Sequence, residues 1–570
     1  MSKTGNLSQI LLHLHLKNRI FLFTIIFYLV LFTSCGTKKS LHHQPSILHY
    51  NATQPTVQKK SNTVFVTGNN TFLKNKQGLW ELYVEGDPLQ IGLTTGALTD
   101  SLLKKQEENF FSRIEDLVPS KFKQNLLRNF LKWYNRKLYL NVSDEYQTEI
   151  YGVSQFTSHT FDNIAPQYLR SLYLHGAHDI GHALQDLSLV GCSSFAAWGE
   201  KSEDGNLILG RNFDFYINDA FAENKIVAFI HPKEGHSFMM VTWPGMIGAV
   251  SGMNKEGLTI TINAGKSKIP LIAKTPISIL TREILQHAKN IEEAVAIAKN
   301  RKVFVSESIM VGSAQDNKAV LIEVSPEKMD VVAVPNSNQL ICSNHFQGDA
   351  FKNDPRNRSQ IANSHSQYRY DRMQELFTEN PKINPEIASK ILRNTDGLKN
   401  IKLGYGNEKS LNQLIAHHGV IFKPKEKLVW VSANPYQLGE FVCYNLDSVF
   451  NEKKNRRVVS YEQESLNIAR DPFIETSAFQ NYQKFKIEDR KIDVFLENKT
   501  EITTQFIKDY QSLNPDYWVV YYKAGLYFYR KKEYRLAQNH FEKALTKEIT
   551  TAPEKKAIEE YLEKIKRKLK

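Results

Sequence analysis

Cysteine is scarce in this chain, with four residues among 570. Cys35, Cys192, Cys342 and Cys443 are too few and too scattered for a disulfide framework. The sequence also lacks a phosphate-binding glycine loop, a dinucleotide fingerprint and a paired-cysteine zinc motif. We therefore expect no cofactor and no structural metal. If Cys35 belongs to an export signal, three cysteines remain, and the odd number favours one free, reactive thiol.

Charge of one sign is not concentrated anywhere before the C-terminal tail. Lysine and arginine number 73 against 60 acidic residues, a formal net charge of +13. The basic residues are interleaved with acidic ones along the chain, without an arginine-rich block or an alternation of aromatic and basic residues. This pattern indicates a solvated basic surface, so we expect no nucleic-acid partner.

Long apolar runs are absent except near the N-terminus, at residues 20–32. This run is shorter than the ~20 residues that span a bilayer, but it suits the core of a signal peptide. Thr33-Ser34-Cys35-Gly36 follows and resembles the lipobox of bacterial lipoproteins, although Phe32 replaces the usual leucine. The resemblance implies that residues 1–35 are a signal, that Cys35 is lipidated, and that the protein lies in the cell envelope. Gly36 favours the outer membrane of a Gram-negative cell. An ordinary cleaved signal, or a short anchor, is the alternative.

The remaining chain divides by composition and apolar spacing into four segments. Polar residues dominate the first, helical spacing the second, strand and turn signals the third, and helical spacing returns in the fourth. The predicted segments are a flexible tether at 36–75, a helical pre-nucleophile segment at 76–191, a catalytic domain at 192–455 and a helical region at 456–570.

Within the third segment, strands are expected before and after a pair of helices, and Asn290 and Glu293 are spaced as an N-cap and its partner. This order predicts an α+β fold in which sheets pack face to face with helices outside. The predicted strands are 206–215, 225–230, 237–243, 258–263, 303–311, 319–324, 331–334, 420–423 and 428–432, and the helices are 277–288, 291–299 and 368–377.

The C-terminal segment contains the spacing of one tetratricopeptide-type (TPR-like) hairpin. One such repeat cannot bury its own apolar face, since about three are needed for independent stability. We therefore expect this tail to pack on the catalytic body, with a peptide-binding repeat domain as the alternative. The residues at the repeat spacing are Ala524, Gly525, Tyr527, Tyr534, Ala537, Phe541 and Ala544.

Several short stretches around Cys192 together resemble a known family. They are similar, in order, to the catalytic chain of N-terminal-nucleophile (Ntn) amidases, above all the acyl-coenzyme A:6-aminopenicillanate acyltransferase-like enzymes, with bile-salt (choloylglycine) hydrolases and penicillin V acylases as more distant relatives. The stretches are Gly191-Cys192-Ser193-Ser194-Phe195, Asp204-Gly205-Asn206-Leu207 with Gly210-Arg211-Asn212-Phe213-Asp214, Gly252-Met253-Asn254-Lys255-Glu256-Gly257-Leu258, Ser343-Asn344-His345-Phe346, Tyr368-Arg369-Tyr370-Asp371-Arg372, and His417-His418-Gly419-Val420-Ile421-Phe422.

The resemblance implies a four-layer αββα sandwich and a set of site residues. Cys192 would be the nucleophile and Gly191 the residue before the cleaved bond. Arg211 matches the family's arginine beside the nucleophile, and Asp214 matches the carboxylate that orients its amine. Asn263 and Asn344 match two oxyanion stabilisers. Arg369 matches a distal arginine, with Arg372 as the rival for that role.

The chemistry explains why self-cleavage before Cys192 would be needed. A thiol that attacks an amide needs a base, and in this class the base is the α-amine of the nucleophile itself. Its unperturbed pKa of about 8 suits that task better than the ~10.4 of a lysine. The amine exists only after an N-to-S acyl shift and hydrolysis have broken the Gly191–Cys192 bond, which leaves two associated chains. One difficulty is that Arg211 and Asp214 would point to opposite faces of a regular strand unless it ends or bulges between them.

The predicted reaction is acyl transfer from a small N-acyl amide to Cys192, and then to water or an amine. Hydrolysis of a linear amide is favoured because acyl-coenzyme A is scarce outside the cytoplasm. One alternative is a non-catalytic envelope lipoprotein that binds a partner through its tail, with Cys192 a buried small residue. Another is a metal-dependent hydrolase, because His175, His178 and His182 share a helix face with Asp179 beside them.

Overall fold

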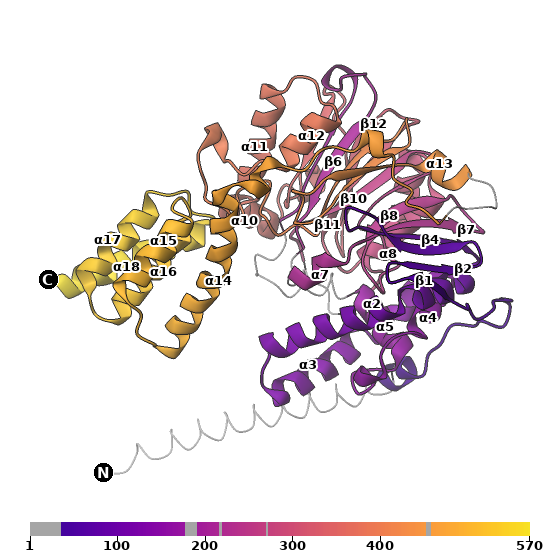
Figure 1. Ribbon diagram of the computed structural model, residues 1–570, viewed down its shortest axis with the longest axis horizontal. Coiled ribbons are helices and arrows are strands. Elements are labelled where there is room, and N and C mark those ends of the chain that lie inside the picture. The colour runs from indigo at the N-terminus through magenta and orange to yellow at the C-terminus, as the bar shows by residue number, and fades with distance from the viewer. Residues whose placement is uncertain (1–35, 177–190, 216–218, 269–271, 452–457) are drawn as a thin grey trace, which may run out of the picture.

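Two β-sheets form the centre of the protein. The computed structural model describes residues 36–176, 191–215, 219–268, 272–451 and 458–570, and within these residues the sheets have eleven and six strands. The larger sheet has the order β1-β2-β3-β4-β7-β8-β9-β10-β11-β12-β13 and the smaller β14-β5-β6-β15-β16-β17 (Figure 1). Every neighbouring pair is antiparallel except β4 and β7. The fold is therefore mixed α+β, as predicted.

Most of the predicted strands begin and end within two residues of the observed bounds. The larger sheet is built from β1 Gln58–Ser61, β2 Val64–Thr67, β3 Asn70–Lys74, β4 Trp80–Gly86, β7 Ile226–Pro232, β8 Phe238–Thr242, β9 Ser251–Asn254, β10 Leu258–Ala264, β11 Glu307–Ser313, β12 Lys318–Val324 and β13 Met329–Val332. The smaller sheet is built from β5 Ser193–Ala197, β6 Ile208–Phe213, β14 Gln339–Cys342, β15 His418–Lys423, β16 Leu428–Ser432 and β17 Phe441–Asn445.

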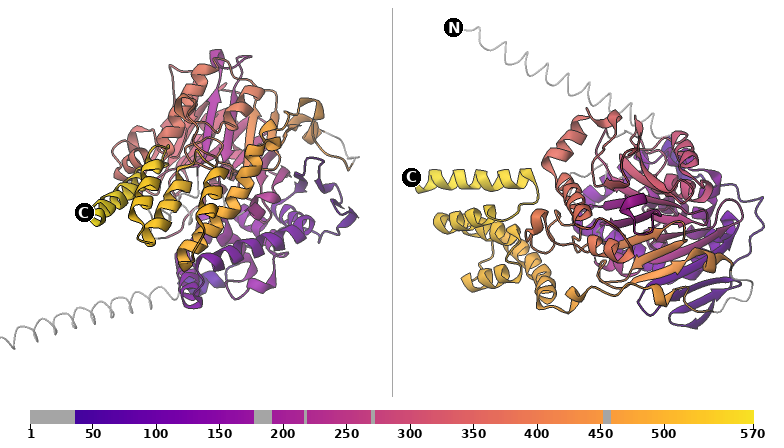
Figure 2. Two further views of the ribbon diagram at one scale, coloured as in Figure 1. Left: turned by 60° about the vertical axis from the view of Figure 1, so that its left-hand side comes forward. Right: turned by 90° about the horizontal axis from the view of Figure 1, so that it is seen from above.

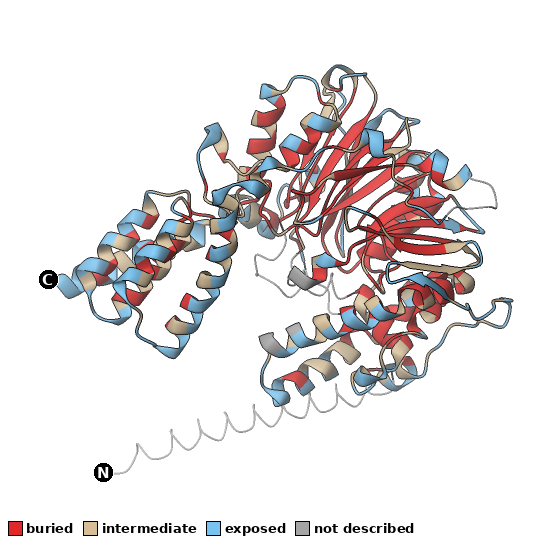
Figure 3. Ribbon diagram, in the orientation of Figure 1, coloured by how far each residue is buried: buried red, intermediate tan, exposed pale blue. Residues whose placement is uncertain are grey.

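The two sheets pack face to face over one apolar core. Val227 and Met239 of the larger sheet and Leu209, Val420 and Val431 of the smaller belong to the same buried cluster. The central strands of both sheets are buried, whereas β1, β2 and β13 at the edges of the larger sheet are not (Figure 3). A strand buried on both faces requires apolar residues at successive positions, which explains the continuous apolar runs of β7, β8 and β16.

Helices cover the outer face of each sheet. A second core joins the larger sheet to the helices α2 Pro88–Leu117, α4 Asp144–Ser154, α5 Gln167–His175, α8 Ile277–His287 and α9 Ile291–Lys299. A third core joins the smaller sheet to α11 Ser366–Glu379 and α12 Pro385–Leu392, where Met373 and Ile391 pack with Ile208 and Ile421. The layers therefore follow the order helix, sheet, sheet, helix.

The flexible tether predicted at residues 36–75 is wrong over its second half. Residues Gln58–Lys74 form β1, β2 and β3, an antiparallel extension of the larger sheet. The apolar residues of this segment come in runs of two or three, too short to stand out in composition. Phe72 is nevertheless buried and stacks on Trp80 of β4, with ring centroids 4.5 Å apart. Long-range packing, rather than local pattern, orders these strands.

Other boundaries differ from prediction for identifiable reasons. Within the predicted helical segment, α2 begins at Pro88, because Asp87 caps it by accepting a hydrogen bond from the Gln90 amide and Pro88 suits the first turn. Helix α3 (Lys121–Tyr134) follows α2. Strand β17 follows the pair that was expected to be last, and β9 and β14 were not predicted because each has only four residues.

Helices α14 Ser477–Asn498, α15 Thr504–Leu513, α16 Trp518–Arg530, α17 Tyr534–Leu545 and α18 Ala552–Leu569 form the C-terminal region. They project from one side of the sheet sandwich (Figure 2). Their aromatic-rich core includes Leu414 and Leu438 of the body that contains the two sheets, so the tail packs on this body. Among the described residues, no helix is both long enough and apolar enough to cross a membrane.

Candidate active site

Cys192 lies at the start of β5, the strand between β14 and β6 in the smaller sheet. The next residue, Ser193, pairs with Asn212 of β6, so the thiol is held against the end of that strand. The cysteine is 1% exposed and unpaired. Burial raises the pKa of the Cys192 thiol to about 11, although the Arg211 cation opposes the shift. The thiol is therefore protonated at neutral pH.

Arg211 and Asp214 both reach Cys192 because β6 ends between them. The Arg211 guanidinium donates to the Cys192 Sγ over 3.7 Å and to the Val250 carbonyl over 3.1 Å. The strand stops at Phe213, so Asp214 is free of the strand alternation that would point it away. The Asp214 carbonyl accepts from the Gly191 amide at 3.3 Å. The end of the strand resolves the difficulty raised by their spacing.

The Asp214 carboxyl has an unusual environment. Both of its oxygens are buried and have no hydrogen-bond partner among the described residues. Burial raises the pKa of this carboxyl to about 7, while the Arg369 and Arg211 cations act in the opposite direction. A buried carboxyl that lacks partners is costly. This carboxyl is therefore a candidate partner for a group that would appear only after cleavage.

Arg369, on α11, contacts the backbone of the nucleophile. One guanidinium nitrogen donates to the Cys192 carbonyl at 2.7 Å and to the Ser193 Oγ at 2.8 Å. The other donates to the Asn344 Oδ1 at 2.6 Å. Arg372, one turn along the helix, instead pairs with Glu375. The structure therefore brings Arg369, not its rival Arg372, to the site.

Asn263 and Asn344 lie beside the nucleophile's strand. Asn263, near the end of β10, accepts from the Ser194 Oγ at 2.6 Å, and its amide donates to the Cys342 carbonyl at 3.4 Å. The Asn344 amide donates to the Ala264 carbonyl at 3.0 Å. The six proposed catalytic residues thus come together from β5, β6, β10, α11 and the loops that follow β6 and β14.

Gln413 is a site residue that the sequence did not reveal. Its amide nitrogen donates to the Gly191 carbonyl at 2.9 Å, the carbonyl of the bond predicted to break. A Cβ added at Gly191 would lie 2.1 Å from that nitrogen, so any side chain there would displace the Gln413 amide from the carbonyl. A lone glutamine in a loop has no spacing or motif by which it could have been found.

The two other body cysteines are buried within the apolar cores. Cys342 belongs to the core between the sheets and Cys443 to the core under α11 and α12. Burial raises the pKa of Cys443 to about 12 and that of Cys342 well above its ordinary value. Neither has a cation hydrogen-bonded to its sulfur among the described residues, in contrast to Cys192.

The proposed metal-binding face is only partly described. His178, Asp179 and His182 lie outside the described residues. His175 uses both ring nitrogens, one with the Ser171 carbonyl at 2.8 Å and one accepting from the Ile247 amide at 3.0 Å. Burial lowers its pKa to about 4. Within the described part of the chain no group of three or more histidine, cysteine and acidic residues could hold a metal.

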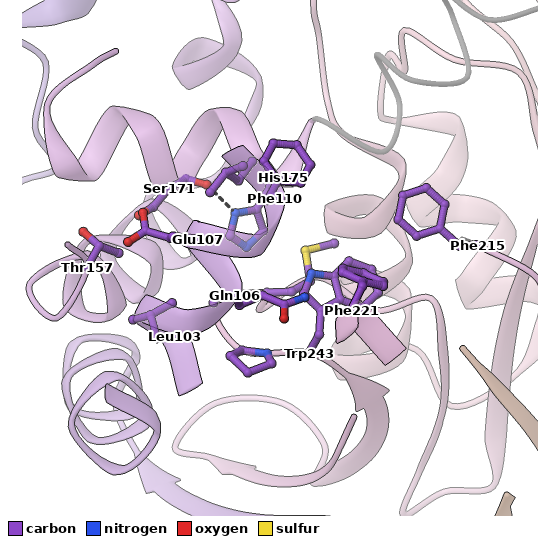
Figure 4. A pocket seen from close by; sticks show the side chains of 14 residues that line it. Leu103, Gln106, Glu107, Phe110, Thr157, Ser171, His175, Phe215, Phe221 and Trp243 are labelled. Carbon is purple, nitrogen blue, oxygen red and sulfur yellow. Dashed lines mark hydrogen bonds between the residues drawn. The ribbon is translucent and has the colours of Figure 1, made fainter. Parts of the chain in front are cut away.

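A pocket with an empty volume of about 620 Å³ lies next to the site (Figure 4). Phe215, one residue from Asp214, and Trp243 line it, and both rings stack on Phe213. Phe213 in turn lies 4.2 Å from the Arg211 guanidinium carbon, so one aromatic cluster joins pocket and nucleophile. The lining is mainly apolar with a polar end and comprises Leu103, Gln106, Glu107, Phe110, Thr157, Ser171, Leu174, His175, Phe215, Phe221, Trp243, Pro244, Gly245 and Met246.

Comparison with known proteins gives a family match over part of the chain. Residues 200–435 match the family described as acyl-coenzyme A:6-aminopenicillanic acid acyl-transferase. The matched stretch includes Arg211, Asp214, Asn263, Asn344 and Arg369, and it begins just after Cys192.

The chain is also similar to curated proteins and solved structures. It is 24% identical over 276 residues to an uncharacterized protein of Archaeoglobus fulgidus (45% of each chain) and 25% identical over 290 residues to protein dcd1B of Dictyostelium discoideum (48% of this chain, 54% of the relative). It therefore spans about half the length of these relatives. An N-acylethanolamine-hydrolyzing acid amidase ortholog of Caenorhabditis elegans has a TM-score of 0.31 at 17% identity, covering 41% of this chain and 93% of that one. A conjugated bile acid hydrolase of Clostridium perfringens has a TM-score of 0.27 at 13% identity, covering 47% and 94%.

Proposed function

We propose, from the match of residues 200–435 to the acyltransferase family and from the geometry around Cys192, that this protein is a self-cleaving cysteine amidohydrolase or acyltransferase with an Ntn αββα sandwich. The observation that carries the proposal is the buried Asp214 carboxyl. It lies beside the nucleophile with both oxygens unpartnered in the described chain. An α-ammonium group on Cys192 would supply the missing partner, and only cleavage creates that group.

The proposed maturation has two steps. The Cys192 Sγ attacks the Gly191 carbonyl carbon, and the tetrahedral intermediate collapses as the peptide nitrogen takes the proton that the thiol gave up. Gly191 is then bound to sulfur as a thioester and Cys192 carries a free amine. Water hydrolyses the thioester, which restores the thiol and leaves Gly191 with a carboxylate. The two chains remain associated because β4, before the cut, pairs with β7, after it.

The same groups would then serve turnover of a substrate amide. The Cys192 amine accepts the thiol proton, and the thiolate attacks the substrate carbonyl. The tetrahedral intermediate expels the substrate amine, which takes the proton from the α-ammonium group. Water, or a second amine, attacks the thioester with the α-amine again as base and releases the acyl group. Arg211, which donates a hydrogen bond to the sulfur, stabilises the thiolate, and Asp214 stabilises the ammonium group.

Amide groups near the nucleophile would hold the negative charge on the substrate oxygen. Asn263 and Asn344 are buried, Asn263 in contact with Ser194 and Asn344 with Arg369. Arg369 fixes the backbone on which the thiol is mounted, through the Cys192 carbonyl. Preorganised donors of this kind typically contribute 10²–10³ in turnover when water is excluded.

We propose a linear N-acyl amide as substrate, with an apolar acyl group in the pocket beside Phe215 and Trp243. The pocket is mainly apolar, and one aromatic cluster connects it to the nucleophile. Hydrolysis is favoured over transfer for two reasons. Water is always present as the acyl acceptor, and acyl-coenzyme A, an acyl donor for transferases, is scarce outside the cytoplasm. No metal or cofactor takes part in the steps above.

The two-chain protein is the first expected result. Intact-mass analysis of purified wild-type protein should give two chains, and N-terminal sequencing should start the larger one at Cys192. The preparation should hydrolyse amides that differ only in the acyl group, with apolar acyl groups preferred. A single chain with full amidase activity would contradict the proposed mechanism.

We also propose that the protein is a lipoprotein of the cell envelope, anchored through Cys35, because an apolar run and a lipobox-like stretch precede the described fold. Two or three acyl chains give stable anchoring where one does not. Cys35→Ser should move the protein from the membrane fraction to the soluble fraction or block its export. Mass spectrometry of the wild-type N-terminal peptide provides the check, and a peptide without acyl chains would overturn the proposal.

A further inference from the structure

The carbonyl of Gly191 accepts a hydrogen bond from a residue far along the chain. The Gln413 Nε2 donates to it at 2.9 Å, inside a site where both residues are buried. We propose that Gln413 is the oxyanion donor for self-cleavage, and that the C-terminal helices hold it in place. This inference rests on the proposed function, since it assigns a role in breaking the Gly191–Cys192 bond.

The position of the Gln413 amide fits this task better than a structural one. The Gly191 carbonyl is the one hydrogen-bond partner of this side chain within the described residues, and the Gln413 Oε1 is buried without a partner there. The partner of the donor is what distinguishes this side chain, because the single donor points at the bond that is to break.

Charge develops on this oxygen when the neighbouring thiol attacks. As the Cys192 Sγ bonds to the Gly191 carbon, the carbonyl π electrons move onto the oxygen. When the intermediate collapses they return and the peptide nitrogen leaves with a proton. A donor already in hydrogen-bond contact with the oxygen stabilises this intermediate without reorganisation. The Gln413 amide carries no charge and needs no proton transfer, so it serves unchanged throughout.

The loop that carries Gln413, residues 403–414, is fixed on its inner side by the catalytic body. The Asn212 amide, on the strand next to the nucleophile, donates to the Leu411 carbonyl at 2.9 Å. The Leu414 amide donates to the Asn412 Oδ1 at 3.0 Å and Leu414 has a φ of 55°, a left-handed conformation uncommon for a leucine. Surrounding contacts must therefore hold this turn in place.

The C-terminal helices supply contacts on the outer side of the loop. Asn514, after α15, exchanges two hydrogen bonds with the Tyr405 backbone, at 3.0 and 2.8 Å. The Asn407 amide donates to the Glu548 carbonyl at 3.0 Å, and the Thr550 hydroxyl donates to the Asn407 Oδ1 at 3.1 Å.

Packing adds to these bonds at both ends of the loop. Leu414, adjacent to Gln413, is fully buried in the aromatic core that α14–α18 form. Gly404 lies so close to α16 that an added Cβ would be 2.4 Å from the Tyr517 backbone. The C-terminal region is thus built into the support of the self-cleavage site, since the residue next to Gln413 belongs to its core.

Self-cleavage of the full chain tests the donor role directly. Gln413→Met keeps the volume of the side chain and removes the N–H, and we expect it to slow conversion of precursor to two chains by about 10²–10³-fold. Gln437→Met is the matched control, because Gln437 is equally buried, donates one bond at 3.3 Å to the Leu392 carbonyl and also has an unpartnered Oε1 among the described residues. It should be cleaved at the wild-type rate. Intact-mass analysis at timed intervals gives the rates, and circular dichroism checks the fold.

The outcomes separate the two proposals. If wild-type protein is never cleaved, the proposed function fails and the donor role fails with it. If wild-type protein is cleaved and folded Gln413→Met is cleaved as fast, or no more slowly than Gln437→Met, only the donor role is overturned. Asn514→Ala, which removes both side-chain bonds to Tyr405, tests the support. It should slow cleavage while the sheets remain folded, and cleavage at the wild-type rate would overturn the role of the C-terminal helices.

Discussion

Cys192→Ala should remain a single chain and show no measurable amide turnover. Both proposed reactions use the same Sγ atom, first against Gly191 and then against substrate, and among the described cysteines only Cys192 has its sulfur hydrogen-bonded to an arginine. Loss of a covalent nucleophile typically lowers turnover on the order of 10⁶-fold. Removing a small buried side chain should cost little in folding, so the precursor should be isolated intact. Intact-mass analysis and an amide assay on one preparation measure both effects.

Cys342→Ala is the matched control for that variant. Cys342 is also buried and unpaired, and it lies on β14, the strand next to β5. Its sulfur donates to the Ser343 carbonyl at 3.4 Å, whereas the Cys192 sulfur accepts from Arg211. The Cys342→Ala protein should cleave itself and turn over substrate like the wild type. Two results would contradict the assignment of the nucleophile. One is self-cleavage of the Cys192→Ala protein, and the other is loss of self-cleavage in Cys342→Ala while Cys192→Ala still cleaves itself.

The sequence was sufficient for the parts of the fold that local pattern determines. Helix α9 was predicted at its observed bounds because Asn290 caps it by accepting from the Glu293 amide, a relation visible in the letters. Strands such as β10 and β16 are apolar or alternating between turn residues, so their positions were also predictable. In contrast, β1–β3 are short, with apolar runs of at most three residues, and they are strands because they extend an existing sheet.

The candidate site divides in the same way. Arg211 and Asp214 stand near Cys192 in the chain and could be recognised by family resemblance, although the end of β6 that lets both reach the thiol could not. Arg369 was separated from Arg372 only by the structure, because the two lie one turn apart on α11 and only their contacts show which one reaches Cys192. Gln413 could not be found at all, since its relation to Gly191 exists only in three dimensions.

Asp214→Asn should abolish turnover even where cleavage is not required. The proposed role of Asp214 is to orient and stabilise the α-ammonium group of Cys192, and asparagine keeps the shape but not the charge. An orienting carboxylate replaced by its amide beside a catalytic base can lower turnover by about 10⁴-fold. Co-expression of residues 36–191 with residues 192–570, after removal of the initiator methionine, bypasses self-cleavage and leaves the amine in place. Turnover of a reactive amide by this assembled enzyme is the measurement.

The matched control for Asp214→Asn is Glu323→Gln, a buried carboxyl whose pKa burial also raises, to about 7. Its oxygens accept from the Gln347 and Gly348 amides, away from the thiol, so turnover should stay near the wild-type value. Asp214 differs because both of its oxygens lack partners among the described residues until an amine is created next to them. If Asp214→Asn turned over substrate as fast as Glu323→Gln, the unpartnered carboxyl would have no part in activating the amine, and the observation that carries the proposed function would lose its meaning.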